Sequence, residues 1–399
     1  MRNIVLLAML ASSFSLQAAV WENTNQWDQT WEEKYSNWVE NEYNEEVYMK
    51  GKYEGIATDC ADAVYGARAI FSFENGLPFA IRDTTGGPAM ISNSMSRYDK
   101  IEDPIARLKK FLWYIFDIAG TKSLPQDTYP VLVNREFVAA GGAWIRPRIT
   151  TRRFFTGAEE TAQPGHAALI KKVEDTGVVF MIESTVPAAV RKLHSTSGLV
   201  FLPENTYGGL RKFYRPDNYK VPKNELPGYS LEQFEMGLDG RKRKLKAWRK
   251  EVYARLATRE ESKEETLQRY ANNFCSMMQS RIEVIQKGEK KRLALGQCMN
   301  EKEFDLYSTP SRDGKARDAL KEFVEVEFDS QKVTEKRLEK LSGYLASCGD
   351  LNVNAQVKMT MLEAAIKMAK EDMSSDPNQT FAARWGLEKE KRTGCKQYY

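Results

Sequence analysis

The sequence predicts an α+β domain at residues 20–222, followed by an all-α domain at 223–399. A segment of small apolar residues begins at Cys60 and is typical of a buried helix, and short β-type runs separated by glycine and proline follow it. Beyond residue 222 the chain is charged and helical in pattern. With 399 residues, of which 42% are apolar and 29% charged, the chain is long enough for two domains.

Residues 1–19 have the pattern of a secretory signal peptide. Arg2 gives a positive start, residues 4–10 are apolar, and residues 15–19 form a small-residue cleavage region. We therefore expect a periplasmic or secreted protein. No later run approaches the roughly 18 apolar residues that a membrane span needs, so no span is expected.

The five cysteines divide into one and four. Cys60 stands alone in the first half, whereas the other four lie in the second half and can form two disulfides in an oxidising compartment: Cys275, Cys298, Cys348 and Cys395. Loop length favours pairing Cys275 with Cys298 and Cys348 with Cys395. An exported, unpaired thiol is a liability unless it is buried or used, so Cys60 is either a small core residue or a nucleophile.

An aromatic and acidic segment precedes the cysteine. Its aromatic side chains recur at helical spacing, four, four and three residues apart: Trp27, Trp31, Tyr35 and Trp38. This spacing predicts a helix that packs its aromatic face on the domain, with a platform for a glycan or another ligand as the alternative. Tyr53 then lies between two glycines, just before the cysteine helix.

The cysteine helix is predicted from its capping residues. Thr58 and Asp59 are residue types that cap helices, which places Cys60 in the first turn. Unpaired N–H groups and the positive end of the helix dipole favour a thiolate there. The glycine and proline of residues 76–78 end the helix.

The region after this helix alternates between elements. Residues 83–100 predict a long loop, with a functional lid, a disordered segment and a simple insertion as the alternatives. Asp103 caps a helix that continues to Ile118. Five short runs then predict a mostly antiparallel sheet behind the cysteine helix: 131–133, 137–138, 144–145, 167–170 and 178–182.

A proline-containing linker at 218–229 leads into the helical half. Residues 241–250 form a basic cluster, which is either a solvated helix face or a surface for an anionic envelope component such as phospholipid or cell-wall polymer. The net charge of +4 and the export signal argue against a nucleic-acid partner.

The chain contains two histidines, so a base for Cys60 can be sought exhaustively. His166 begins an apolar strand, which fixes its ring, whereas His194 lies in a polar segment and is expected to be remote. If residues 167–182 form a hairpin, Glu183 returns level with His166 and can orient it. The alternative for Glu183 is an exposed charge at a strand end.

These residues resemble a family. The segment 59–63 around Cys60, then Arg68 and the turn at 76–78, is similar to the cysteine helix of transglutaminase-like proteins, and His166 followed by Glu183 resembles their histidine and acidic strands. Cell-wall endopeptidases of the papain-like class share these parts, with Tyr53 near the place of their active-site tyrosine. The resemblance implies a papain-like domain, although Ala168 and Glu183 stand where the family has an aromatic residue and an aspartate.

The resemblance implies an exported thiol-dependent amide hydrolase or acyltransferase, acting on peptide or cell-wall amides. Cys60 would attack the carbonyl, His166 would move the proton and Glu183 would orient the ring. Tyr53 and Asp59 are expected in the oxyanion and substrate region.

The alternative is an inactive domain that serves as a cell-envelope binding or assembly module. No metal or other cofactor is expected, because the two histidines lack ligand spacing. The chain also lacks the G-x-S-x-G elbow of many serine hydrolases.

Overall fold

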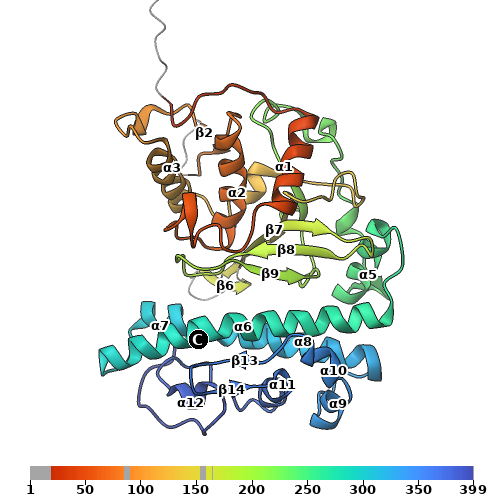
Figure 1. Cartoon of the computed structure of the whole chain (residues 1–399). Coiled ribbons are helices and arrows are strands. Elements are labelled where there is room, and N and C mark those ends of the chain that lie inside the picture. The colour runs from red at the N-terminus through yellow and green to blue at the C-terminus, as the bar shows by residue number, and fades with distance from the viewer. Residues whose placement is uncertain (1–18, 85–89, 153–158, 164, 399) are drawn as a thin grey trace, which may run out of the picture.

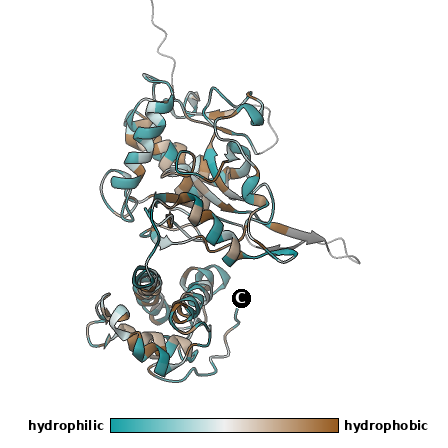
Figure 2. Ribbon diagram, turned by 90° about the vertical axis from the view of Figure 1, so that its right-hand side faces the viewer, coloured by the Kyte–Doolittle hydropathy of each residue, from teal (hydrophilic) through white to brown (hydrophobic). Residues whose placement is uncertain are grey.

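The computed structural model describes residues 19–84, 90–152, 159–163 and 165–398, without the side chains of 150–152 and 159–163. The predicted signal peptide lies almost wholly outside the described residues. The chain forms two halves, one above the other in Figure 1 and again after a quarter turn in Figure 2. The upper half holds a sheet with helices and the lower half is mainly helical, so the predicted α+β class is confirmed.

A six-stranded sheet forms the centre of the upper half. Its strand order is β3-β10-β4-β7-β8-β9, and every neighbouring pair is antiparallel, as predicted. The strands are β3 (Thr128–Pro130), β4 (Ala143–Arg146), β7 (His166–Val173), β8 (Val179–Glu183), β9 (His194–Ser197) and β10 (Gly209–Phe213). The strand expected at 131–133 thus lies three residues earlier, and 137–138 belong to a turn instead.

Smaller elements surround this sheet. Two further antiparallel pairs are β1 (Ala80–Arg82) with β2 (Met90–Ser92) and β5 (Ile149–Arg152) with β6 (Glu159–Gln163). The short helices are η1 (Gly51–Tyr53), η2 (Ser96–Tyr98), α4 (Leu124–Asp127), η3 (Lys223–Glu225) and η4 (Glu232–Phe234). The expected loop at 83–100 therefore contains β2 and η2, and its residues 85–89 lie outside the described part of the chain.

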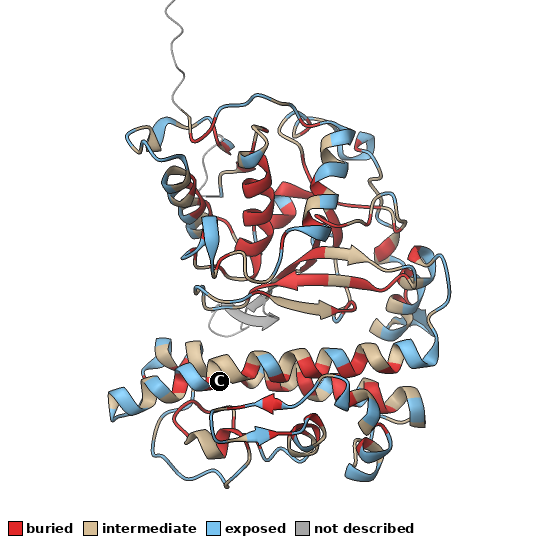
Figure 3. Ribbon diagram, viewed as in Figure 1, coloured by how far each residue is buried: buried red, intermediate tan, exposed pale blue. Residues whose placement is uncertain are grey.

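Helix α2 (Cys60–Glu74) is the buried helix predicted from the small apolar segment. Every residue from Cys60 to Ser72 is buried, and Figure 3 shows this helix in the interior of the upper half. A helix that is buried on all sides needs small or apolar residues around its whole circumference, which this segment supplies. It ends before Gly76, which has a φ of +57°, a left-handed conformation that favours glycine.

Helices α1 (Gln29–Asn41) and α3 (Pro104–Ile118) contribute to the same core as α2. The aromatic rings of α1 gather around Phe71 of α2, with centroid distances of 6.4 Å for Trp31, 5.2 Å for Tyr35 and 5.5 Å for Trp38. The aromatic face therefore packs on the domain, as predicted.

Arg68 of α2 is buried in this core. It forms a two-pronged ion pair with Glu32 of α1, at 2.7 and 3.0 Å, and its guanidinium lies 3.3 Å from the centre of the Trp27 ring. The side chains of Arg68 and Glu32 are 4% and 12% exposed. Removal of one partner leaves an uncompensated buried charge.

We expect Arg68→Met to lower the free energy of unfolding by about 3–5 kcal/mol, measured by chemical denaturation. The matched control is Lys370→Met, which removes an ion pair with Glu335 whose partners are 53% and 49% exposed. This control should cost less than about 1 kcal/mol. Equal losses in the two variants would contradict a structural role for the buried pair.

The other face of the sheet is covered by α5 (Leu245–Leu256). Trp248 and Val252 belong to one buried cluster with Trp144 of β4 and Met181 of β8. The core on this face of the sheet thus includes residues up to Leu256, beyond residue 222, where the sequence predicts the domain boundary, because the proline-containing segment packs into the same cluster.

The basic cluster at 241–250 is largely occupied with contacts inside the protein. Arg243 donates to three backbone carbonyls, Arg249 pairs with Glu322, and Lys246 pairs with Glu325. These contacts reduce the charge that the cluster can offer to an anionic surface.

The lower half is built around α6 (Lys263–Leu295) and α8 (Pro310–Phe328), which contribute most of its core together with α11. Its other elements are α7 (Glu301–Tyr307), α9 (Glu335–Lys340), α10 (Ser342–Ala346), β13 (Leu351–Asn352), β14 (Lys358–Met359), α11 (Met361–Ala369) and α12 (Phe381–Arg384). The hairpin β13–β14 means that this half is not all-α as expected. Within the described residues, no helix combines the length and apolarity needed to cross a membrane.

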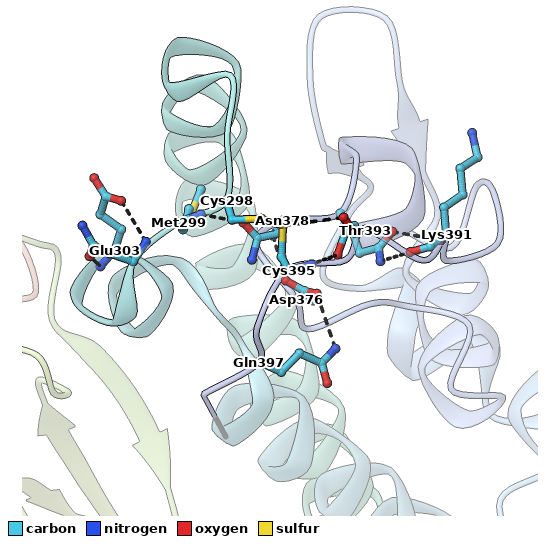
Figure 4. Close-up of a disulfide and its surroundings, with 11 residues drawn as sticks. Cys298, Met299, Glu303, Asp376, Asn378, Lys391, Thr393, Cys395 and Gln397 are labelled. Atoms are coloured by element: carbon cyan, nitrogen blue, oxygen red, sulfur yellow. Dashed lines mark hydrogen bonds between the residues drawn. A yellow bond between two sulfur atoms is a disulfide. The ribbon is translucent and has the colours of Figure 1, made fainter.

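Two disulfides link this half, but not in the expected pairs. Cys275 bonds to Cys348, and Cys298 bonds to Cys395 near the C-terminus, as Figure 4 shows for the second bond. The expected pair Cys275–Cys298 is wrong because α6 separates its members. The 20 residues from Cys275 to the end of α6 span about 30 Å, far beyond the reach of a disulfide.

Candidate functional site

Cys60 is the first residue of α2, and a capping box fixes this helix end. The Asp59 carboxylate accepts hydrogen bonds from the N–H groups of Ala61 and Asp62 at 3.0 and 3.3 Å, and the Asp62 carboxylate accepts one from the Asp59 N–H at 2.7 Å. Cys60 is only 4% exposed, and its Sγ lies 3.3 Å from Oγ1 of Thr121. A rigid helix end therefore holds the sulfur.

His166 is the first residue of β7, and its Nε2 lies 2.5 Å from Oε2 of Glu183 at the end of β8. The hairpin pattern predicts that the two residues lie directly opposite each other, and this prediction is wrong. A register shift between Ile170 and Lys172 places Glu183 opposite Ala168, so that it reaches His166 along a diagonal. Diagonal neighbours lie about 7–8 Å apart at the backbone, within reach of a long glutamate side chain.

The charge of His166 is set by its neighbours. Burial lowers the pKa of His166, but the charge of Glu183 and hydrogen bonds with Cys60 and Glu183 outweigh this effect and raise the pKa from 6.5 to about 9. Since Glu183 occupies Nε2, the nitrogen that remains for Cys60 is Nδ1. The structure thus brings together the three residues that the sequence proposed as a triad.

Lys315 of α8, in the lower half, completes the arrangement. Its Nζ lies 3.1 Å from Oε1 of Glu183, so this carboxylate bridges His166 and Lys315. Burial alone would raise the pKa of Glu183, but the charges of Lys315 and His166 hold it well below its usual range. Glu183 is therefore an anion whose two oxygens are both engaged.

His194 is not remote, contrary to expectation. It pairs with Glu183 across β8 and β9, and directly opposed residues share a face of a sheet. Its Nε2 lies 3.3 Å from Nη2 of Arg312 on α8. Burial, reinforced by the charge of Arg312, lowers the pKa of His194 to about 3, so this ring is neutral at physiological pH.

Tyr53 does not reach the cysteine, which corrects its expected oxyanion role. Its hydroxyl donates a 2.6 Å hydrogen bond to Glu74, the last residue of α2. Cys60 and Glu74 lie at opposite ends of this helix, about 21 Å apart along its axis. The chain order of the tyrosine and the cysteine resembles the family, but η1 carries Tyr53 to the far end of the helix.

Asp59 caps α2 and carries no proton donor for an oxyanion, so its expected oxyanion role is replaced by a structural one. Its neighbour Asp62 is different. Burial and then the charge of Asp59 raise the pKa of Asp62 from 3.8 to about 8, and its Oδ1 is buried without a hydrogen-bond partner in the described structure. Protonation of Asp62 removes a buried charge next to the Asp59 carboxylate.

The two histidines give a direct test by ring NMR, since no others are present. The His166 imidazole should stay protonated until about pH 9, and the His194 imidazole should stay neutral down to about pH 3. Because the raised pKa is a property of the folded state, His166 stabilises the fold below pH 6.5, and this contribution disappears as the pH rises through 9.

The two partners of His166 should change its pKa in opposite directions. Glu183→Gln should lower it because the attracting charge is lost, whereas Lys315→Met should raise it because a repelling charge is lost. Two rings that both titrate near pH 6.5 would contradict the arrangement.

No match to this chain was found among protein-family models, curated proteins or solved structures. Sequence reasoning missed Lys315, His194 and Thr121 as neighbours of the triad. Nothing local marks Lys315 or Thr121, since both arrive from distant elements. The sequence around His194 carries one signal. A short polar run begins at this residue and has an apolar residue close to each end, a pattern that fits a strand.

Proposed function

We propose that the protein is an exported thiol-dependent enzyme that cleaves or transfers an acyl group at a peptide amide. The observation that carries the proposal is the His166–Glu183 pair, at 2.5 Å, together with Cys60 at a helix N-terminus, a neighbour that helps to raise the pKa of this imidazole. A cysteine, an imidazole and an orienting carboxylate are the parts that nucleophilic catalysis requires.

The proposal gives each residue one role. Cys60 attacks the amide carbonyl as a thiolate and forms an acyl-enzyme, while His166, as an imidazolium, gives its Nδ1 proton to the leaving amine. Glu183 holds the ring by Nε2 and stabilises its positive charge, and Lys315 positions Glu183. The backbone N–H of Cys60 is the nearest candidate oxyanion donor, since Asp59 caps the two following residues instead.

The acyl-enzyme then reacts with water or with an amine. Water gives hydrolysis and an amine gives acyl transfer, so the acceptor decides between the two activities. The papain-like character of the domain belongs to this proposal. It is supported by the antiparallel sheet next to the cysteine helix and by the order of cysteine, histidine and acid along the chain.

The second candidate function is an inactive domain that serves as a binding or assembly module in the cell envelope. The observation that favours it is the 4% exposure of Cys60, because a nucleophile must meet its substrate. The disulfide-linked helical half would then make the contacts.

Alkylation of the native protein separates the two functions. Cys60 is the free cysteine of the described chain, so iodoacetamide labelling followed by peptide mapping reports on it alone. If the protein is an enzyme, iodoacetamide should alkylate Cys60 at pH 7 about tenfold or more faster in the parent than in the His166→Ala variant, because the imidazolium stabilises the thiolate. His194→Ala, which removes the other histidine, is the control and should label like the parent. Labelling of Cys60 only after denaturation would favour the module.

A further inference from the structure

A cavity of about 220 Å³ lies between the two halves, next to the proposed triad. One wall comes from the loop after β8 and from His194 of β9, and the other from α6, α7 and Arg312 of α8. The loop is anchored beside Cys60, because Ala189 and Thr58 exchange backbone hydrogen bonds of 3.1 and 3.3 Å.

Positive charge dominates this cavity. Its lining carries four cations, Arg191, Lys192, Lys287 and Arg312, against one carboxylate, Glu283. Glu283 is already paired with Lys287 at 2.5 Å, and Lys192 lies 3.9 Å from Glu46. His194 adds no charge, since its ring is neutral. Arg191 and Arg312 remain, and the carboxylates that attract them, such as Glu283 and Asp313, form no direct ion pair with either guanidinium among the described residues.

Both guanidiniums are incompletely satisfied. Arg191 donates to Thr185 and to the carbonyl of Pro187, and Arg312 contacts His194. Neither forms an ion pair within the described part of the chain, and the Nε of each is buried without a hydrogen-bond partner. Burial and the nearby charge of Arg191 lower the pKa of Arg312 to about 10. Two neighbouring, partly buried cations without a direct ion pair repel each other, and a bound anion relieves that repulsion.

We propose that this cavity is a binding site for a small oxyanion, a carboxylate or a phosphate group, held by Arg191 and Arg312. A guanidinium offers paired N–H donors that match both groups. The cavity is smaller than the roughly 300–1,000 Å³ of sites for drug-sized ligands, which fits a single anionic group with few attached atoms. The site does not depend on Cys60 being a nucleophile.

Calorimetric titration of the disulfide-bonded chain tests the site, with inorganic phosphate in one arm and acetate in the other, at constant ionic strength in sodium chloride. We expect saturable binding in at least one arm, and the stronger arm identifies the anion. Arg312→Gln should weaken binding about tenfold or more, because a charged hydrogen-bonding group is lost. Arg241→Gln, in the exposed basic cluster, is the matched control and should bind like the parent.

Glu283→Gln supplies the opposite prediction. It removes the one carboxylate that the described residues contribute to the lining, so it should tighten binding several-fold. Its side chain is 40% exposed, so this variant should fold even if Arg312→Gln does not. Cys60→Ala should bind like the parent, which separates failure of this site from failure of the proposed catalysis. Heat signals no larger than those of added chloride, or weaker binding in Arg241→Gln with unchanged binding in Glu283→Gln, would overturn the proposal.

Discussion

Cys60→Ala should abolish amide turnover while leaving the fold intact. The side chain fills little volume at the start of a capped helix, so its loss removes the sulfur without disturbing Asp59 or the capping box. Because the sulfur forms the acyl-enzyme, no other group can replace it. We expect a loss of about 10³-fold or more in kcat/KM, down to the background rate.

The other members of the triad should not fail equally. His166→Ala removes the proton carrier and should match Cys60→Ala. Glu183→Gln preserves the shape but loses the charge that stabilises the imidazolium, so it should retain activity reduced by about 10- to 100-fold, in line with roughly 1.5–3 kcal/mol for a charged hydrogen bond. Glu183→Ala should retain less.

The series needs an assay that covers both acceptors. Suitable substrates are cell-wall peptides and casein for hydrolysis, and amine incorporation into glutamine peptides for transfer. Circular dichroism and melting temperatures of all four variants control for folding, and Leu387→Ala at an exposed site should behave like the parent. Full biological function of Cys60→Ala in the parent organism would show that the chain acts as a binding module.

The local parts of this site could be predicted because their signals are local. A capping residue pair and a run of small apolar residues define the start of α2. The predicted position of Cys60 in the first turn of this helix is therefore confirmed. The His166–Glu183 pair was predictable because one hairpin joins them, and a hairpin brings its two ends together whatever the rest of the chain does. Only the register shift near Ile170 escaped the pattern.

The distant parts could not be predicted, because they depend on how the halves pack. Lys315 lies 132 residues from Glu183 along the chain, and no periodicity connects α8 with the end of β8. Tyr53 shows the converse error, since closeness in sequence to Cys60 did not mean closeness in space. The sequence also carries no sign that Trp248 belongs to the core of the sheet, because this residue follows the proline-containing segment and joins the sheet only through packing.

Loss of the Cys275–Cys348 bond should destabilise the lower half selectively. The bond closes a separation of 73 residues and ties the middle of α6 to the segment after α10. Removal of a native disulfide typically costs about 2–5 kcal/mol. Hydrogen exchange of the Cys275→Ser/Cys348→Ser double variant should therefore speed up in α6 and α8, while β7 and β8 keep their protection.

The bond between Cys298 and Cys395 provides the comparison. It closes a separation of 97 residues but attaches only the C-terminal segment, so the corresponding double serine variant should expose that segment more than α8. Peptide mapping without reductant should recover both links. Four free thiols, or a peptide joining Cys275 to Cys298, would contradict the arrangement.

Full reduction of the disulfides should also change the pKa of His166, because α8 carries Lys315. If the lower half loosens, Glu183 loses the cation that holds its Oε1, and His166 loses a repelling charge. The pKa of His166 should then shift in the same direction as in Lys315→Met, upward, although no cysteine of the two disulfides touches the ring. An unchanged His166 titration in the reduced protein, with faster exchange in α8, would show that the two halves are not coupled through this lysine.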